Sequence, residues 1–358
     1  MSFINLFELE KLAEAKLEKI AFDYYSSGAH DEITLRDNRE AFNKIKIHYK
    51  VLVDVSKRDT ATEIFGQKIS FPLIIAPTAF HKMACKEGEC ATAQAAKEAG
   101  TIMCLSTLSN TKVEDVSRSS EVNFWFQLYV FRDKSVTEKL VRRVEKAGAK
   151  TLVVTVDAPL LGTRERDVRN QFQLPKGLSV INLLPDNKEE LPDDKPDSGL
   201  ALYFNEMLDQ SLNWKDIEWL ASITKLPIIL KGIVRPDDAL RAIDCGAKGI
   251  VVSNHGGRQL DTSPATIEVL PTIADAVNDR IEILMDGGIR RGTDIIKAIA
   301  LGAKAVLMGR PVLWGLAHNG YEGVCDVLSL MKKEFDLAMA LSGCASVEEI
   351  QRDLVSLK

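Results

Sequence analysis

The sequence predicts an α/β fold, a (β/α)8 TIM barrel, and three observations support this prediction. Short apolar runs alternate eight times with segments of helical spacing. The runs are apolar almost throughout, which suits parallel strands buried on both faces, and the helical segments end in glycine. The length of 358 residues fits one elaborated barrel, although it also allows two domains.

The expected strands follow one another between residues 73 and 310. They cover residues 73–76, 102–106, 124–130, 151–157, 227–232, 249–255, 281–288 and 305–310. Helical patterns such as 135–148 and 291–302 separate them. A doubly wound sheet is the rival interpretation, but that fold usually has fewer strands and a glycine-rich turn after its first strand. Here the glycine pairs follow the sixth and seventh strands, which favours the barrel.

Two segments depart from this regular spacing within the one expected domain, 1–358. Residues 1–72 contain a helical stretch, 4–25, which we expect to pack across one end of the barrel. After the fourth strand comes a long insertion, 160–213, whose middle is rich in Pro, Asp, Lys and Glu and lacks apolar periodicity. Such a loop on the active face of a barrel is predicted to be mobile and to act as a lid. Residues 311–358 are expected to form C-terminal helices.

Composition and charge argue against several classes of function. The chain is 46% hydrophobic and 27% charged, as ordinary globular proteins are. Its net charge is −5, and no Lys/Arg cluster alternates with aromatic residues, so we expect neither nucleic acid nor a membrane as a partner. The six cysteines show no disulfide pattern, and we find no signal peptide or long apolar run. We therefore expect a soluble, cytoplasmic protein. The ending 355–358 is not a peroxisomal targeting signal, so a peroxisomal location is not expected.

Polar residues gather at the carboxyl ends of the expected strands. These ends form one mouth in a barrel, so residues far apart in the sequence converge there. In strand order the residues are Pro77, Thr78 and Ala79; Ser106; Gln127 and Tyr129; Thr155 and Asp157; Lys231; Ser253, His255 and Arg258; Asp286, Gly287 and Gly288; and Gly309 and Arg310. Their convergence is stronger evidence for a site than any one of them alone.

The segment 253–261, SNHGGRQLD, is the most informative of these strand ends. It brings together a base, His255, a fixed cation, Arg258, and two glycines. An imidazole accepts a proton, a guanidinium matches the two oxygens of a carboxylate, and glycine leaves room for a flat cofactor. A lone histidine is usually a surface or core residue, but its place before a Gly-Gly turn favours a catalytic role.

The last two strand ends predict a phosphate site. Residues 286–294 and 308–311 place glycine backbone and the side chains of Arg290 and Arg310 beside helix starts. Backbone N–H groups at a helix start bind anions, and the loops after strands seven and eight are a common phosphate site in barrels. The alternative is an ordinary glycine helix entry with solvated arginines.

A metal site is not expected. His81, Cys85 and Cys90 are three side chains of the two types, imidazole and thiolate, that often bind metals. They lack a fourth ligand and lie on a helical pattern, so packing explains them better.

These segments together resemble the FMN-dependent 2-hydroxy-acid oxidases and dehydrogenases, the family of glycolate oxidase and L-lactate oxidase. The resemblance covers nearly the whole chain, and the matching segments are FDYYSSGA, IAPTAF, FQLYV, TVDAP followed by Arg164, LKG, SNHGGRQLD, DGGIRRGTD and GRP. The resemblance implies FMN, with its phosphate at Arg290, Gly309 and Arg310. The residues expected around its ring are Pro77, Thr78, Ala79, Ser106, Gln127, Thr155, Lys231 and Ser253. Asp286, Gly287 and Gly288 are also expected to bind this cofactor.

The resemblance implies roles in proton and electron transfer. His255 would take the hydroxyl proton of the substrate, and Asp157 would stabilise the imidazolium that forms. The α-hydrogen would leave toward the flavin, either as hydride or after a carbanion has formed. Lys231 suits the stabilisation of negative charge on a reduced flavin, although a structural ion pair is an equal use for it.

The resemblance also implies how the substrate binds. Arg258 and Arg164 would clamp its carboxylate, and Tyr24 and Tyr129 would bind its carboxylate or hydroxyl oxygens. Tyr24 belongs to an aromatic cluster, and packing of the amino-terminal segment is the alternative role for it. Arg164 has other charged residues nearby in the sequence, and such residues are usually exposed to solvent. Its distance along the chain from Asp157 distinguishes it from them as the candidate for substrate binding.

Leu108 and Phe204 bear on the choice of substrate. Glycolate oxidases typically have tryptophan at the position of Leu108, and the smaller leucine leaves room for the methyl group of L-lactate. Phe204 also fits the lactate type, whereas Thr78 is usual in glycolate oxidases. We therefore expect (S)-2-hydroxy acids as substrates, with L-lactate favoured. Glycolate is expected as a second substrate, because one methylene changes binding by only about 1–3 kcal/mol.

O2 is the expected electron acceptor, which yields H2O2 and the 2-oxo acid. A lactate monooxygenase and a soluble L-lactate dehydrogenase with another acceptor are alternatives. More distant ones are a sugar-phosphate isomerase or aldolase without redox chemistry and a non-catalytic flavin-binding protein. The resemblance implies a homotetramer.

Overall fold

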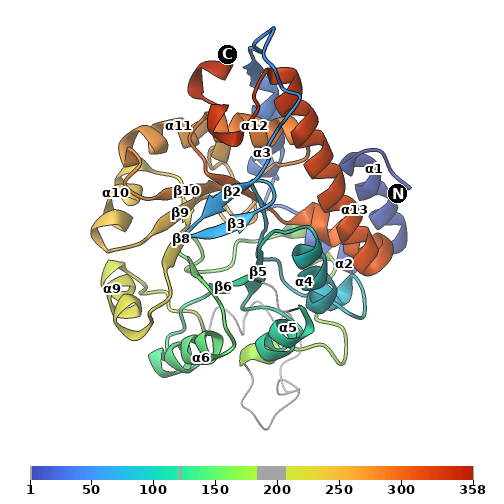
Figure 1. Ribbon diagram of the computed structural model, residues 1–358. Coiled ribbons are helices and arrows are strands. Elements are labelled where there is room, and N and C mark those ends of the chain that lie inside the picture. Colours follow the sequence, from blue (N-terminus) through green and yellow to red (C-terminus); the bar gives the residue numbers. More distant parts are fainter. Residues whose placement is uncertain (1, 121–122, 184–206, 358) are drawn as a thin grey trace.

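The computed structural model describes residues 2–120, 123–183 and 207–357, and it confirms the predicted TIM barrel. Eight parallel strands form a closed barrel (Figure 1). They are β4 (Leu73–Ile75), β5 (Met103–Ser106), β6 (Phe124–Leu128), β7 (Leu152–Thr155), β8 (Ile228–Ile233), β9 (Gly249–Val252), β10 (Glu282–Met285) and β11 (Ala305–Met308). They follow chain order around the barrel, and β11 pairs with β4 to close it.

Helices follow the strands and cover the outside of the barrel. They are α4 (Glu89–Glu98), α5 (Val113–Ser120), α6 (Lys134–Lys146), α9 (Trp214–Ile223), α10 (Pro236–Asp244), α11 (Thr266–Val277), α12 (Gly292–Ala300) and α13 (Arg310–Ser342). Local sequence explains several starts: Asp133 caps α6, Asn213 and Asp216 form a capping box at α9, and α10 begins with proline. α13 is kinked at Asn319 and Gly320.

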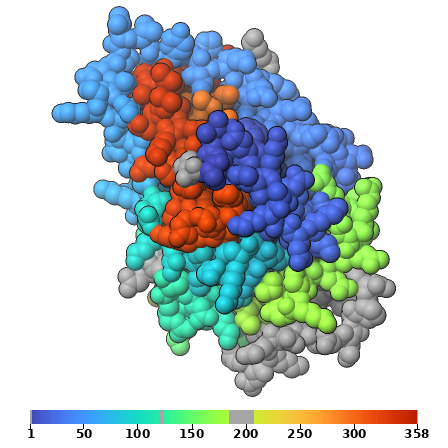
Figure 2. Space-filling model, turned by 90° about the vertical axis from the view of Figure 1, so that its right-hand side faces the viewer, coloured from blue at the N-terminus to red at the C-terminus, as the bar shows by residue number. Residues whose placement is uncertain are grey.

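The amino-terminal segment holds more than the expected helical stretch. Residues 4–25 form two helices, α1 (Leu6–Lys16) and α2 (Lys19–Ser26), because the backbone is extended at Leu17. α1 packs along α13, as Figure 2 shows in dark blue and orange-red. A third helix, α3 (Ile33–Lys44), leads into β1 (Ile45–Ile47). That strand pairs antiparallel with β12 (Val355–Leu357), which the sequence pattern did not predict.

A hairpin that the sequence analysis missed packs against the apolar interior of the barrel. Its strands are β2 (Thr62–Ile64) and β3 (Gln67–Ile69). Ile64 and Ile69 join an interior core that contains Ile74, Cys104, Trp125, Val153, Ile229, Val251, Leu284 and Leu307. Phe65 at the hairpin turn packs into space that Gly249 leaves, since a Cβ there would lie 2.5 Å from Phe65 Cζ. The hairpin therefore covers the apolar interior that the barrel alone would expose.

The insertion is described only in part. Its described ends contain α7 (Glu165–Arg169) and a 3-10 turn at Ile181–Leu183. Residues 184–206 lie outside the described residues, so the expected lid and Phe204 are not placed. Short 3-10 turns also occur at His81–Met83, Val347–Glu349 and Arg352–Leu354. Among the described residues, no helix has the length and apolar character needed to cross a membrane.

Truncating Trp125 tests the interior core. Trp125→Ala should lower the free energy of unfolding by about 3–5 kcal/mol, because it leaves a cavity where a fully buried indole packs. Urea denaturation followed by circular dichroism measures the change. Phe7→Ala removes an aromatic ring that is 39% exposed on α1 and should cost less than about 1 kcal/mol. Equal losses in the two variants would contradict this account of the core.

Candidate active site

The polar residues of the site lie inside the barrel because side chains alternate along each strand. The interior core includes Cys104, Trp125, Val153, Ile229, Val251 and Leu284 on β5 to β10. Two residues further along each chain segment stand Ser106, Gln127, Thr155, Lys231, Ser253 and Asp286, all buried. Residues i and i+2 of a strand face the same side, so this second set forms a polar layer above the apolar core.

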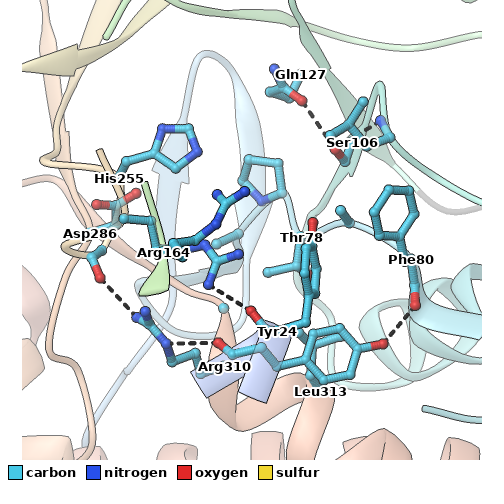
Figure 3. Close-up of a pocket in the computed structure, with 18 of the residues that line it drawn as sticks. Tyr24, Thr78, Phe80, Ser106, Gln127, Arg164, His255, Asp286, Arg310 and Leu313 are labelled. Carbon is cyan, nitrogen blue, oxygen red and sulfur yellow. Dashed lines mark hydrogen bonds between the residues drawn. The ribbon is translucent and has the colours of Figure 1, made fainter. Parts of the chain in front are cut away.

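A cavity of about 420 Å³ opens at this polar layer (Figure 3). The predicted site residues that line it are Tyr24, Pro77, Thr78, Ala79, Ser106, Leu108, Gln127, Tyr129, Thr155, Arg164, Lys231, His255, Arg258, Asp286, Gly287, Gly288, Arg290, Gly309 and Arg310. Asp157 and Ser253 do not line the cavity but hydrogen bond to His255 and Lys231, which do. The structure thus brings together all the predicted residues that it describes.

His255 and Asp157 form a hydrogen-bonded pair at the cavity wall. Asp157 Oδ1 lies 3.0 Å from His255 Nδ1, and a carboxylate only accepts, so Nδ1 carries the proton of the neutral ring. Nε2 is then an acceptor, 3.5 Å from the Tyr129 hydroxyl. Burial alone would raise the pKa of Asp157, but the charge of His255, its hydrogen bond and Lys231 lower that pKa. The pair is therefore a base whose protonated form already has a counterion.

The backbone around His255 is unusual and explains the two glycines that follow it. His255 has φ 59°, in the left-handed region that non-glycine residues seldom adopt. Gly256 and Gly257 continue in that region, with φ 63° and 75°. A Cβ at Gly257 would lie 2.6 Å from the backbone nitrogen of Leu35, so only glycine fits between this turn and α3. The strained turn is part of how the imidazole is presented to the cavity.

Lys231 lies on the polar layer in a network of its own. Its Nζ lies 3.0 Å from Asp286 Oδ2 and donates to Ser253 Oγ at 2.9 Å. Burial would lower the pKa of Lys231, but Asp286 and Asp157 outweigh it and raise that pKa, so the ammonium stays charged. Asp286 Oδ1 is buried and has no hydrogen-bond partner among the described residues. The ion pair considered from sequence is present, and the charged Lys231 still lines the cavity.

Arg164 and Arg258 lie on one side of the cavity, next to the ring of Tyr24. That ring packs among other aromatic rings. The guanidinium carbon of Arg258 lies 5.1 Å from the centre of the Tyr24 ring, and that of Arg164 lies 5.8 Å from it. Arg258 Nη1 donates to the carbonyls of Tyr24 at 2.7 Å and Ser27 at 3.0 Å. Figure 3 shows Arg164 near His255 and Tyr24, away from Ser106 and Gln127. Two cations beside the base therefore offer a place for a carboxylate.

A second group of cations, Arg290 and Arg310, lies at the predicted phosphate site. Burial lowers the pKa of Arg310 to about 9 and that of Arg290 to about 10, and neighbouring arginines contribute to both shifts. Arg310 donates to three carbonyls, those of Tyr25, Gly256 and Ser27, each at 3.0 Å. Within the described ranges neither arginine forms an ion pair with a carboxylate. Partly buried positive charge that no carboxylate contacts directly fits a bound phosphate.

The glycines near these arginines have different reasons to be glycine. A Cβ at Gly309 would lie 3.1 Å from Thr78 Cγ2 and would narrow the cavity that both residues line. A Cβ at Gly288 would lie 1.9 Å from the carbonyl oxygen of Asn38. Gly288 thus allows α3 to pack against the strand end, and this packing, rather than a ligand, requires the glycine.

Sequence reasoning missed several residues that shape the cavity. Tyr25 lines it and donates to the Phe80 carbonyl at 2.6 Å, and the Phe172 ring stacks on Tyr24 at 4.3 Å. His81, considered only as a metal ligand, bonds through Nε2 to Thr78 Oγ1 at 2.7 Å and through Nδ1 to Thr92 Oγ1 at 2.9 Å. The aromatic pair at residues 24 and 25 was a usable signal for Tyr25, whereas nothing local marked Phe172.

Comparisons with known proteins show to which family the chain belongs. The family of FMN-dependent dehydrogenases matches residues 13–357. An L-lactate oxidase of Nostoc sp. is 54% identical over 99% of this chain and 98% of its own length. The glycolate oxidase of Spinacia oleracea is 49% identical over 99% of this chain and 96% of its own length. A crystal structure of mandelate oxidase superposes with a TM-score of 0.93 at 40% identity, covering 100% of this chain and 99% of that one.

Replacing Arg310 tests the phosphate site. Arg310→Met should weaken the binding of FMN by about tenfold to a hundredfold, because a charge-assisted hydrogen bond contributes about 1.5–3 kcal/mol. Fluorescence titration of the cofactor-free protein measures the affinity. Binding of riboflavin, which lacks the phosphate, should not change. Arg235→Met, which removes an exposed arginine paired with Asp237, is the matched control and should bind FMN like the wild type.

Proposed function

Since the chain belongs to the family of FMN-dependent dehydrogenases, we propose that it oxidises L-lactate, and glycolate as a second substrate, to the 2-oxo acid with reduction of O2 to H2O2. It is an FMN-dependent 2-hydroxy-acid oxidase, and FMN is its cofactor. The observation that carries the proposal is the pairing of His255 with Asp157 at 3.0 Å in a cavity that also holds Arg164 and Arg258. A base and two cations are what the oxidation of a hydroxy-carboxylate needs.

The cavity fits FMN in two regions. Arg290 and Arg310 would hold its phosphate, because these partly buried cations form no ion pair with a carboxylate among the described residues. The polar layer would surround its ring through Gln127, Thr155 and Lys231. When bound, FMN supplies the acceptor for the two electrons that leave the substrate.

His255 and the two mouth arginines act on the substrate. Arg164 and Arg258 bind its carboxylate and thereby hold the hydroxyl-bearing carbon against the cofactor. His255 Nε2 takes the hydroxyl proton while Asp157 keeps the ring oriented and neutralises the imidazolium. The Tyr129 hydroxyl, 3.5 Å from Nε2, stays protonated because burial and Asp157 raise its pKa. It therefore donates a hydrogen bond to a substrate oxygen.

The apolar wall of the cavity supports L-lactate as the preferred acid. Leu108 is buried and lines the cavity together with Phe80 and Leu161. A methyl group gains contact with such a wall, whereas glycolate has only hydrogen to offer. One of the two relatives described above is named for lactate and the other for glycolate, at similar identity. The wall at Leu108 is thus the physical reason for our choice.

An anaerobic visible spectrum of the holoenzyme tests the proposal directly. L-lactate should bleach the flavin band near about 450 nm, glycolate should do so more slowly, and admission of O2 should restore the band with formation of H2O2. A yellow protein that neither acid bleaches would overturn the substrate assignment. We further propose that the protein is cytoplasmic and forms a homotetramer. Sedimentation velocity tests the oligomeric state.

Removal of the base should affect chemistry more than binding. His255→Asn should lower the rate of flavin reduction by L-lactate by about 10²–10⁴-fold, since general base catalysis contributes that much. Stopped-flow spectroscopy measures the rate, and FMN content is checked on the same sample. His318→Asn replaces a histidine that bonds to Ser2 outside the cavity and should leave the rate unchanged. A His255→Asn rate within about threefold of wild type would refute the assigned role.

Enlarging the side chain at Leu108 should shift the substrate preference. Leu108→Trp should lower the ratio of kcat/KM for L-lactate to that for glycolate by about tenfold or more, because the indole fills the space of the methyl group. Steady-state kinetics with both acids measures this ratio. Leu160→Trp changes an exposed leucine in the segment that follows β7 and is the control. An unchanged ratio in Leu108→Trp would place the methyl group elsewhere.

A further inference from the structure

Asp167 lies at the mouth of the cavity and is bound to one of the two arginines of the clamp. Arg164 Nε donates to Asp167 Oδ2 at 2.8 Å, and both side chains are largely buried. The bond uses the side edge of the guanidinium. The two terminal nitrogens of Arg164 have no hydrogen-bond partner among the described residues, so they stay available for a carboxylate. Asp167 therefore orients Arg164 without occupying its binding edge.

The second oxygen of Asp167 is in an unfavourable place for a negative charge. Asp167 Oδ1 is buried and accepts no hydrogen bond from the described residues, although the side chain lines the cavity. A buried carboxylate oxygen without a donor is costly unless it is protonated or balanced by cations. The charged and titratable groups around it are Arg164, Arg258, Asp23 and Tyr24. Burial raises the pKa of Asp167, while Arg258 and Arg164 oppose that shift.

The helix that carries Asp167 is fixed to the amino-terminal segment. Figure 2 shows the bright green stretch that contains α7 beside the dark blue helices. Arg166 pairs with Glu32 at 2.7 Å, and Asn170 donates to Asp23 at 2.7 Å. Phe172 stacks on Tyr24. Since α7 is held by these contacts, an incoming anion meets Asp167 in place and does not simply displace it.

We propose that Asp167 is a positioning residue that takes up a proton when the carboxylate of the substrate binds Arg164 and Arg258. This inference rests on the proposed function, which places that carboxylate at the two arginines. With the substrate bound, two carboxylates share two guanidinium groups, and one of those carboxylates is buried with an oxygen that lacks a donor. A proton taken up from solvent removes the repulsion, because the buried oxygen that lacks a donor then carries no negative charge. Substrate affinity is thereby coupled to pH through Asp167.

Binding of pyruvate to the oxidised holoenzyme tests this coupling without turnover. Its Kd is measured from the change in flavin absorption between about pH 6 and about pH 9 for the wild type and three variants. Asp167→Asn keeps an acceptor for Arg164 but cannot titrate. Asp167→Ala loses that acceptor. Glu165→Gln removes an exposed carboxylate of the same helix, one that pairs with Arg169, and is the matched control.

The expected results separate titration from simple packing. The wild type and Glu165→Gln should bind pyruvate about tenfold more weakly at the upper pH than at the lower one. For Asp167→Asn, the ratio of the pyruvate affinities at the two pH values should be at least about fivefold smaller than for the wild type. At the upper pH this variant should bind pyruvate no more weakly than the wild type does. Asp167→Ala should bind weakly throughout. Calorimetry in two buffers of different ionisation enthalpy should show proton uptake by the wild type. If Asp167→Asn is unstable, the same measurement on His255→Asn, in which His255 cannot take up the proton, decides the question.

The opposite results overturn the inference at separate points. A pH dependence of Asp167→Asn that coincides with that of the wild type, or binding without proton uptake, would show that Asp167 does not titrate with the substrate. A wild type that binds no pyruvate and is not bleached by L-lactate would instead refute the proposed function. Unchanged pyruvate affinity in Arg258→Met would refute the clamp on which both depend.

Discussion

The rest of the site depends on the two-residue repeat of side chains along the barrel strands. In β5 to β10 the inward positions change from apolar to polar between one inward residue and the next, as from Trp125 to Gln127 and from Val251 to Ser253. The apolar layer fills the barrel and the hairpin of β2 and β3 covers it. The apolar layer therefore keeps the polar layer at the mouth of the barrel. There a ligand can supply the hydrogen-bond partners that the polar groups still need.

Charge is balanced unevenly across this mouth, and the imbalance divides it into regions. Asp157 faces His255, and Asp286 faces Lys231, so each of these groups has a carboxylate partner. Arg290 and Arg310 form no ion pair with a carboxylate among the described residues, and Glu10 acts on both only at longer range. Arg164 and Arg258 share a single carboxylate, Asp167. Each excess of positive charge corresponds to a negative group of the expected ligands: the phosphate of FMN in one region and the carboxylate of the substrate in the other.

The amino-terminal helices complete what the barrel begins. The last turn of α2 has carbonyl groups without intrahelical partners, and those of Tyr24, Tyr25 and Ser27 accept hydrogen bonds from Arg258 and Arg310. One helix end thus holds an arginine of each region and satisfies its own backbone at the same time. Tyr24 and Tyr25 of the same helix line the cavity, and the Tyr24 ring stacks on Phe172 of the insertion.

The sequence by itself determined the barrel and most of the cavity wall. Apolar runs that end in polar residues identify both the strands and the end at which they act, because the repeat is local and every strand of a barrel obeys it. His255 and Arg258 could be selected for the same reason, since their strand end and glycine turn are contiguous in the chain. The tertiary structure decided what no local pattern encodes. The pairing of β1 with β12, the hairpin against the barrel interior, the stack of Phe172 on Tyr24 and the bond of His81 to Thr78 depend on which surfaces meet after folding. Likewise, the sequence does not distinguish Asp167 from an ordinary surface charge on a short helix. Only the packing of that helix against α2 buries the carboxylate and leaves one of its oxygens without a donor among the described residues.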